Sequence, residues 1–182
     1  MAPNAEFFRA CNAASGGKIR LVTLAPNMPG SLEFIKEVSD EVMVSIGHTT
    51  ADYDTALAAM KAGAHHVTHL YNAMPPFAHR NPGVIGAAFA DPECRLELIC
   101  DGYHIHGAVV RATFSVMGSE RMVLISDSMM ATGMPNGTYS LGGQAVWMKD
   151  GKATLTDGET IAGSATNLYD CMRKAVSFDI PL

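Results

Sequence analysis

Four ionisable residues stand at, or a few residues after, the ends of short hydrophobic segments. The four are His48 in VMVSIGH, His69 in HVTHLYNAM, His104 after LELICDGY and Asp127 in MVLISD. Neutral imidazoles bind divalent cations, and a carboxylate beside a reacting water can accept its proton and return it to a leaving amine. The repetition predicts a metal-dependent hydrolase site.

The elements that must position these residues alternate along the chain. Apolar segments at residues 19–26, 42–48, 66–74, 95–102 and 122–127 are typical of strands. Helical spacing of apolar residues appears before, between and after them, at residues 5–14, 31–38, 51–62, 107–117 and 166–178. Strand and helix in alternation predict right-handed βαβ units and a parallel sheet, whose carboxyl ends would carry the four residues.

The fold class predicted from this order is α/β. A closed eight-stranded barrel typically needs about 250 residues, whereas this chain has 182. We therefore expect either a smaller open sheet or part of a TIM-type (β/α)8 barrel. Between residues 133 and 163 the sequence becomes rich in glycine, and Lys149-Asp150-Gly151 predicts a hairpin turn between AVWM and KATL. A β-hairpin insertion near residues 138–162 is the corresponding expectation.

Composition excludes several functional classes. The formal net charge is -5 and no Lys/Arg cluster is present, so neither nucleic acid nor an anionic membrane is an expected partner. No apolar stretch reaches the roughly 18 residues of a membrane span, and the N-terminal segment does not resemble a signal peptide. The four cysteines form no CxxC pair. These features predict a cytoplasmic protein with reduced thiols.

Taken one at a time, the candidate residues have ordinary structural explanations. A histidine at a strand end is more often structural than a metal ligand, and Asp127 could cap a helix or stabilise a turn. Asp101-Gly102 is a common turn dipeptide, and a loop arginine such as Arg80 is usually solvated. The two histidines His48 and His69 strengthen each other, because neighbouring strand ends can direct two imidazoles at one cation.

Longer motifs carry a more specific signal. The stretches VTLAPNMPG, SIGHTTADYDTALAAMKAGA, THLYNAMPPFAHRNPGVIGAAF, LICDGYHI, LISDSMMATGMPNGTYSLGG and TIAGSATNL extend over most of residues 21–168. Through them the chain resembles the N-acetylglucosamine-6-phosphate deacetylases of the amidohydrolase superfamily. The resemblance implies hydrolysis of the N-acetyl group by metal-activated water, giving glucosamine 6-phosphate and acetate in amino-sugar catabolism.

The resemblance also implies roles for particular residues. His48 and His69 would bind one divalent metal, either zinc or iron. Asp127 would be the catalytic acid and base, and His104 would orient and polarise the acetamide carbonyl. The substrate, a phosphorylated amino sugar, would be bound by Asn72, Ala73, Arg80, Asp101, Gly102, Tyr103, His104, Ile161, Ala162 and Gly163. A homodimer is the oligomeric state that the family implies.

The chain also departs from the family pattern. The upstream HLEGP motif, whose glutamate is a further metal ligand, is absent from it, and Asn27 stands where TLAPE would have a glutamate. By this alignment residues 1–182 form a partial barrel domain holding about strands four to eight, without the family's small β-sandwich domain. We expect the isolated chain to be poorly active. The alternatives are another amide hydrolase of the superfamily and a barrel remnant without catalytic function.

Overall fold

The structure is a computed structural model that describes residues 2–181. The chain divides into two compact units, Met1–Glu97 and Leu98–Leu182. Five strands follow one another in chain order in one sheet, β1-β2-β3-β4-β5, and three more form an antiparallel sheet, β6-β7-β8. The registers from β1 to β4 are parallel. The predicted α/β class and parallel sheet are confirmed.

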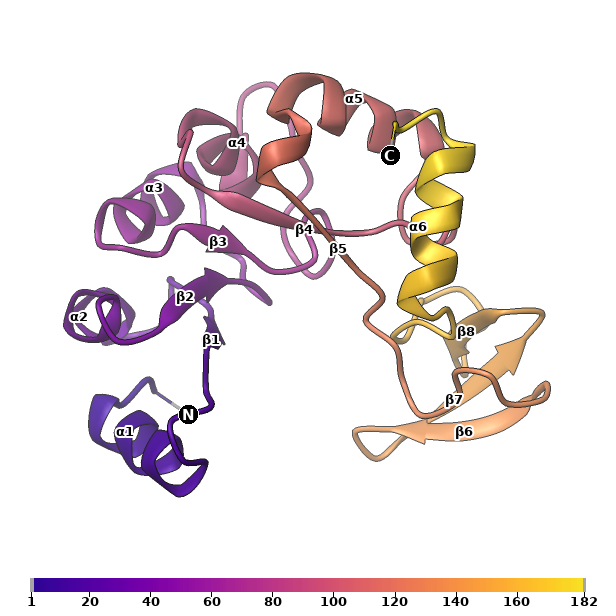
Figure 1. Cartoon of the computed structure of the whole chain (residues 1–182), viewed down its shortest axis with the longest axis horizontal. Coiled ribbons are helices and arrows are strands. Elements are labelled where there is room, and N and C mark those ends of the chain that lie inside the picture. Colours follow the sequence, from indigo (N-terminus) through magenta and orange to yellow (C-terminus); the bar gives the residue numbers. More distant parts are fainter. Residues whose placement is uncertain (1, 182) are drawn as a thin grey trace. The chain divides into compact units, whose positions relative to one another are not determined.

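The first unit alternates helices and strands. Its elements are α1 (Ala5–Ala14), β1 (Leu21–Leu24), α2 (Ser31–Val38), β2 (Met43–Ile46), α3 (Tyr53–Lys61), β3 (His66–Val67), α4 (Gly83–Ala90) and the start of β4 (Arg95–Ile99). Helices α2, α3 and α4 lie along one side of strands β1 to β3 (Figure 1). Their apolar faces and the strands bury a common core that includes Ile35, Val44, Ile46, Met60 and Val67.

Local chemistry explains where these helices begin. The Asn4 side chain accepts the Phe7 N–H at 2.7 Å, and the Asp52 side chain accepts the Thr55 N–H at 2.8 Å. Each bond satisfies an amide that has no partner within the first helical turn. The helices predicted at residues 5–14, 31–38 and 51–62 are therefore confirmed, with the last one beginning after its cap, at Tyr53.

Two expectations for this unit need correction. The strand predicted at residues 66–74 ends at Val67, because His69, Tyr71 and Ala73 take positive φ angles that a strand cannot contain. Helix α4 was not predicted. Six of its eight residues are buried, so its sequence GVIGAAFA has no polar face to give a helical period.

The second unit contains the rest of the chain. After β4 come α5 (Gly107–Met117), a short 3₁₀ helix (Ser119–Arg121), β5 (Met122–Ile125), β6 (Gly137–Leu141), β7 (Gln144–Lys149), β8 (Lys152–Leu155) and α6 (Leu168–Ser177). The predicted hairpin is confirmed as the β7–β8 pair. Its turn residues Asp150 and Gly151 both have positive φ, as the tightest hairpin turns require.

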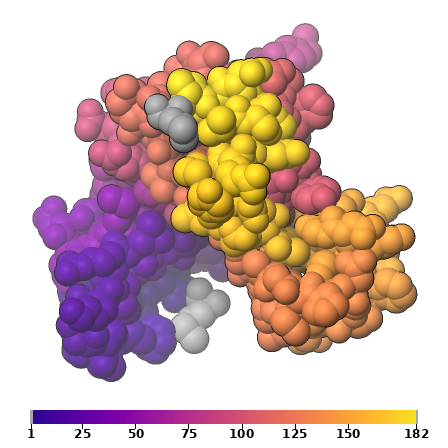
Figure 2. Space-filling model, turned by 45° about the vertical axis from the view of Figure 1, so that its right-hand side comes forward, coloured from indigo at the N-terminus to yellow at the C-terminus, as the bar shows by residue number. Residues whose placement is uncertain are grey.

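The antiparallel sheet of the second unit has a small core of its own. Val146 and Met148 of β7 and Ala153 of β8 pack with Met129, Ala131 and Ala162. Helix α6 (yellow in Figure 2) lies next to this sheet (orange) in both views. Within the described residues, no helix is both long and apolar enough to cross a membrane.

Candidate functional site

His48 and His69 meet in the first unit. Their Nε2 atoms are 2.8 Å apart, and their rings are 4.5 Å apart at an angle of 80°. His48 follows β2 and is exposed, whereas His69 follows β3 and is only 5% exposed. Two ring nitrogens that converge in this way can share one cation, so this pair fits a divalent metal. Among residues 2–181 no group of three or more His, Cys, Asp or Glu side chains is placed to hold one.

Backbone conformation sets the candidate residues apart. Seven described residues other than glycine have positive φ, and four of them are His48, His69, Ala73 and Asp127. Such conformations are unfavourable for side chains with a Cβ atom and persist only where surrounding contacts hold them, most often at functional sites. Four of the seven strained positions are therefore candidate residues, and the other three are Tyr71, Asp150 and Asp179.

Hydrogen bonds hold the two turns that carry the histidines. Thr49, which is 4% exposed, donates its N–H to the Ala73 carbonyl at 3.1 Å and its hydroxyl to Asn27 Oδ1 at 2.5 Å. Asn27 Nδ2 in turn donates to Thr50 Oγ1 at 3.2 Å. Asn27, to which the sequence assigned no role, therefore fastens the loop that follows His48.

The residues expected to bind the phosphorylated sugar occupy different places in this unit. Asn72 donates its side-chain amide to the carbonyls of His69 and Leu70, both at 3.3 Å, so it stabilises the turn. Ala73 is exposed at the end of the same turn. Arg80 is exposed and lines a separate pocket beside the start of α3, which neither Asn72 nor Ala73 lines.

In the second unit, Asp101 organises the turn that carries His104. One carboxylate oxygen accepts the N–H groups of Tyr103 and His104 at 2.8 and 2.9 Å, and the other lies 2.7 Å from His104 Nδ1. Burial by itself would raise the pKa of Asp101, but these hydrogen bonds and the nearby imidazole outweigh burial and lower that pKa. The ionised carboxylate accepts a hydrogen bond from the Nδ1–H group, which leaves Nε2 of His104 for a substrate.

The segment near residue 161 meets this turn at a tightly packed pocket that is too small to admit a water molecule. Its lining includes Asp101, Tyr103, His104, Ile161 and Gly163. Two predicted residues do not line it: Ala162 is buried in the core of the antiparallel sheet, and Gly102 is exposed beside the Lys174 side chain. The pocket thus brings together five of the seven substrate residues predicted in this unit.

Asp127 follows β5 and is exposed. Its carbonyl accepts the Ser164 N–H at 2.9 Å, and Ser128 and Ser164 form a parallel bridge. Ser164 is also part of the pocket lining. The backbone of Asp127 is therefore fastened to the segment that shares the pocket with His104, while its carboxylate remains open to solvent.

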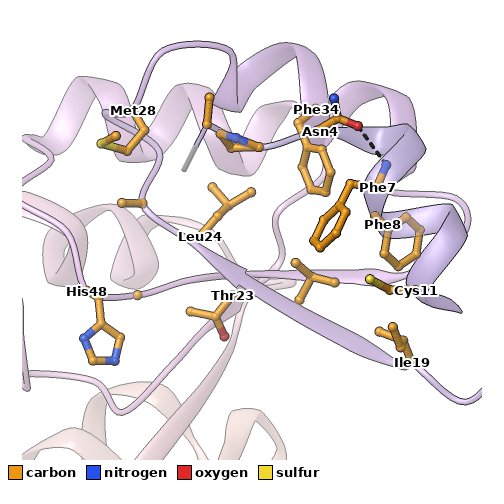
Figure 3. A pocket seen from close by; sticks show the side chains of 15 residues that line it. Asn4, Phe7, Phe8, Cys11, Ile19, Thr23, Leu24, Met28, Phe34 and His48 are labelled. Carbon is orange, nitrogen blue, oxygen red and sulfur yellow. Dashed lines mark hydrogen bonds between the residues drawn. The ribbon is translucent and has the colours of Figure 1, made fainter. Parts of the chain in front are cut away.

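A groove of about 600 Å³ runs beside β1 in the first unit. Figure 3 shows its lining, with Phe7, Phe8 and Phe34 at one end and His48 at the other. Thr23 and Leu24 of β1 form its floor between them. Most of the lining is apolar, so one side of His48 faces a hydrophobic surface.

The structure adds residues that the sequence reasoning did not identify. Thr49 and Asn27 hold the His48 loop, and the side chain of Glu97 accepts the His69 N–H at 3.2 Å. Their sequence signals are weak, because a threonine after a histidine or a glutamate inside a strand is common. Only the fold brings Glu97 to a turn 28 residues before it in the chain.

Curated proteins similar to this chain include deacetylases of amino-sugar phosphates. No protein-family model matches the chain. N-acetylglucosamine-6-phosphate deacetylase of Bacillus subtilis is 44% identical over 174 residues, which are 95% of this chain and 44% of that protein. N-acetylgalactosamine-6-phosphate deacetylase of Escherichia coli O157:H7 is 39% identical over 90% of this chain and 43% of its own length.

Solved structures agree with these relatives. N-acetyl-D-glucosamine-6-phosphate deacetylase of Mycobacterium smegmatis superposes with a TM-score of 0.92 at 37% identity, over 98% of this chain and 48% of that one. The Thermotoga maritima enzyme of the same name gives 0.87 at 29% identity, over 97% and 47%. The chain spans about half the length of the relatives that it matches.

Proposed function

This chain is homologous to N-acetylglucosamine-6-phosphate deacetylases, and from that premise we propose that its protein hydrolyses the N-acetyl group of N-acetylglucosamine 6-phosphate to acetate and glucosamine 6-phosphate. The observation that carries the proposal is the convergence of His48 and His69 at 2.8 Å, on strained turns within the most specific motifs. The relatives named above make an amide of a phosphorylated amino sugar the best-supported substrate.

The two histidines would hold one divalent metal, zinc or iron. Bound there, the metal would supply Lewis-acid activation of water for attack on the amide. The chain's own contribution is to present both Nε2 atoms, with the His69 ring buried and the His48 ring at the end of an apolar groove. Neutral imidazole is a ligand for both ions, so the residues alone do not select between them.

Proton transfer is assigned to Asp127. Its carboxylate would take a proton from the attacking water and deliver it to the departing amine nitrogen, so that acetate and a free amine result. Support comes from the left-handed backbone conformation of Asp127, from its exposure, and from the hydrogen bond between its carbonyl and the Ser164 N–H, which holds its main chain in place.

His104 would act on the acetamide carbonyl. With Nδ1–H donated to Asp101, Nε2 is the nitrogen that can face the carbonyl oxygen, and a proton there would stabilise negative charge developing on that oxygen. The Asp101 turn with Ile161 and Gly163 would contact the sugar, and Arg80 would bind the phosphate from its own pocket, while Asn72 and Ala73 would shape the turn after His69. We place the reaction in the cytoplasm and expect a homodimer.

Acetate release from N-acetylglucosamine 6-phosphate, measured with zinc or ferrous iron added to the protein that carries this chain, tests the activity. The Asp127→Asn variant should lose about 10²- to 10⁴-fold in kcat, the usual contribution of general acid–base catalysis. Asp179→Asn serves as the matched control at another carboxylate with positive φ. Equal turnover by both variants would contradict the role of Asp127.

Metal binding can be tested on the 182-residue chain itself. Equilibrium dialysis with zinc should give one site, which His48→Ala and His69→Ala each weaken by at least tenfold. His79→Ala should leave it unchanged, because His79 is an exposed loop residue. The isolated chain should release acetate slowly even with metal, since residues 2–181 place no third, anionic ligand beside the two histidines.

A second substrate is favoured by one observation, the 39% identity to an N-acetylgalactosamine-6-phosphate deacetylase. The two sugars differ only in the configuration at C4. Comparing kcat/KM for both 6-phosphates decides between them, and a preference for the galacto sugar would replace the substrate proposed above. No acetate from either would favour another amide substrate or a remnant without catalytic function.

A further inference from the structure

A row of polar side chains crosses the sheet of the first unit, from the exposed Thr23 to the buried Ser45 and His66. Thr23, Ser45 and His66 are register partners on β1, β2 and β3. Ser45 Oγ lies 3.0 Å from His66 Nδ1 and 2.6 Å from Thr68 Oγ1, and Thr68 Oγ1 lies 2.9 Å from Thr23 Oγ1. Ser45 and His66 are 0% and 4% exposed. Buried polar groups are costly unless they are paired, and these are paired with one another.

Glu97 of β4 connects this row to the His69 turn. Its Oε2 accepts the His69 N–H at 3.2 Å, and its main-chain oxygen accepts the Leu70 N–H at 2.8 Å. Its other carboxylate oxygen is 3.8 Å from His66 Nε2, which is too long for a direct hydrogen bond. One residue therefore holds two successive amides of the turn, while His66 lies against its carboxylate.

The turn that Glu97 holds contains a strained residue, His69. His69 has φ of 32°, and a residue with a Cβ atom keeps such a conformation only where its neighbours hold it. If the His69 amide were released, its backbone could relax toward ordinary angles. The ring would then swing with the Cα–Cβ bond, and its Nε2 would lose the 2.8 Å approach to His48 Nε2.

We infer that Glu97 is a positioning residue, whose carboxylate fixes the backbone of His69 and thereby aims the His69 imidazole at its partner. His66, whose Nδ1 is hydrogen-bonded to Ser45, lies beside the carboxylate of Glu97. The inference rests on the proposed metal-binding role of His48 and His69, and it does not depend on the substrate.

Among residues 2–181 no group of three metal-binding side chains includes Glu97, so the inference gives it a positioning role and not that of a ligand. One oxygen of its carboxylate already accepts an amide proton and the other faces His66. Its effect on metal binding must therefore pass through the shape of the His69 turn, as is common for residues that orient a metal ligand.

The test compares Glu97→Ala, which removes the acceptor, with Glu97→Gln, which keeps an amide oxygen of the same reach. Glu93→Ala is the matched control at an exposed glutamate of the preceding turn. Two readouts are needed: hydrogen exchange of the His69 amide by NMR without metal, and the zinc dissociation constant by equilibrium dialysis. Glu97→Ala should speed the exchange by about tenfold or more and weaken zinc by about 10- to 100-fold, while Glu97→Gln and Glu93→Ala stay close to the unsubstituted chain.

Unchanged exchange of the His69 amide in Glu97→Ala would overturn the inference, as would equal exchange rates in Glu97→Ala and Glu97→Gln. A third outcome separates the two proposals. If Glu97→Ala speeds exchange of the His69 amide but the unsubstituted chain binds no zinc, the positioning role is supported and the proposed metal pair is rejected. Should Glu97→Ala not fold, Glu97→Asp gives the same test, because its shorter carboxylate keeps the charge and cannot reach the amide.

Discussion

The buried carboxylate of Asp101 fixes both the turn at residues 101–104 and the orientation of the His104 ring. It accepts two main-chain N–H groups and faces the Nδ1 of His104, so one side chain sets both the turn and the orientation of the imidazole. Its side chain is 2% exposed. An ionised group so buried is tolerated only because every one of these contacts favours the charged form.

The lowered pKa of Asp101 predicts how stability depends on pH. Because the folded-state pKa lies below the ordinary value of 3.8, ionised Asp101 stabilises the folded state above about pH 3.8. That stabilisation is lost as the pH falls through the folded-state pKa. Asp101→Asn should therefore lower Tm at pH 7, and the difference in Tm between the two proteins should shrink as the pH falls well below 3.8.

Thermal unfolding followed by circular dichroism between pH 7 and pH 2.5 measures this difference. At neutral pH the loss should correspond to about 1.5–3 kcal/mol, the usual range for hydrogen bonds to a charged group. Asp40→Asn, at an exposed carboxylate, is the control and should shift Tm little at any pH. A difference in Tm that does not shrink anywhere in the acidic range where both proteins remain folded would contradict a contribution from the charge of Asp101.

Among the elements, β2 and its following residue are the most constrained. Gly47 lies between β2 and His48, and a Cβ atom there would stand 2.8 Å from Thr23 Cγ2 and 2.9 Å from Thr68 Cβ. Both contacts are shorter than carbon atoms accept. Strands β1, β2 and the turn after β3 can approach each other this closely only because residue 47 has no side chain.

Gly47→Ala should consequently destabilise the fold by about 1–3 kcal/mol, the range for overpacked cores. It should also weaken zinc binding, because the clash separates the β2 end from the His69 turn. Gly137→Ala is the matched control, since neither glycine has positive φ and a Cβ at 137 has no neighbour nearer than 3.8 Å. Chemical denaturation of both variants measures the difference, and equal stabilities would exclude the clash.

These elements show which parts of the structure were predictable. Periodic helices with caps, such as α1 and α3, and the Asp150-Gly151 hairpin were predicted because neighbouring residues determine them. The strand at 66–74 was wrong beyond Val67 and α4 was missed. In the first case hydrogen bonds from β4 bend the chain after β3, and in the second burial on all sides removes the helical period.

For the molecule as a whole, the edge of the parallel sheet at β1 is the part most prone to associate with other chains. Among the described strands, β1 pairs with β2 alone, and the apolar groove of Figure 3 lies beside it. An edge strand next to an apolar surface is prone to pair with other chains. The isolated 182-residue chain should therefore self-associate.

Leu21→Lys should reduce this association, because a charge on an edge strand opposes pairing in water. Leu21 is 37% exposed, and its register partner Met43, on the neighbouring strand β2, is 43% exposed. Met43→Lys is thus a control with similar exposure away from the edge. Analytical ultracentrifugation across concentration gives the comparison, and an equal effect of both lysines would implicate general hydrophobicity instead of the β1 edge.

The sequence by itself determined the α/β class, most of the helices, the hairpin and the residues that could do chemistry, because all of these depend on local patterns and motifs. Tertiary structure alone decided that His48 and His69 approach within 2.8 Å, that both sit on strained turns, and that Asn27, Thr49 and Glu97 hold those turns. The reason is physical. Residues 20 to 30 positions apart come together only when parallel strands pair, and a positive φ at a histidine persists only where those partners hold it.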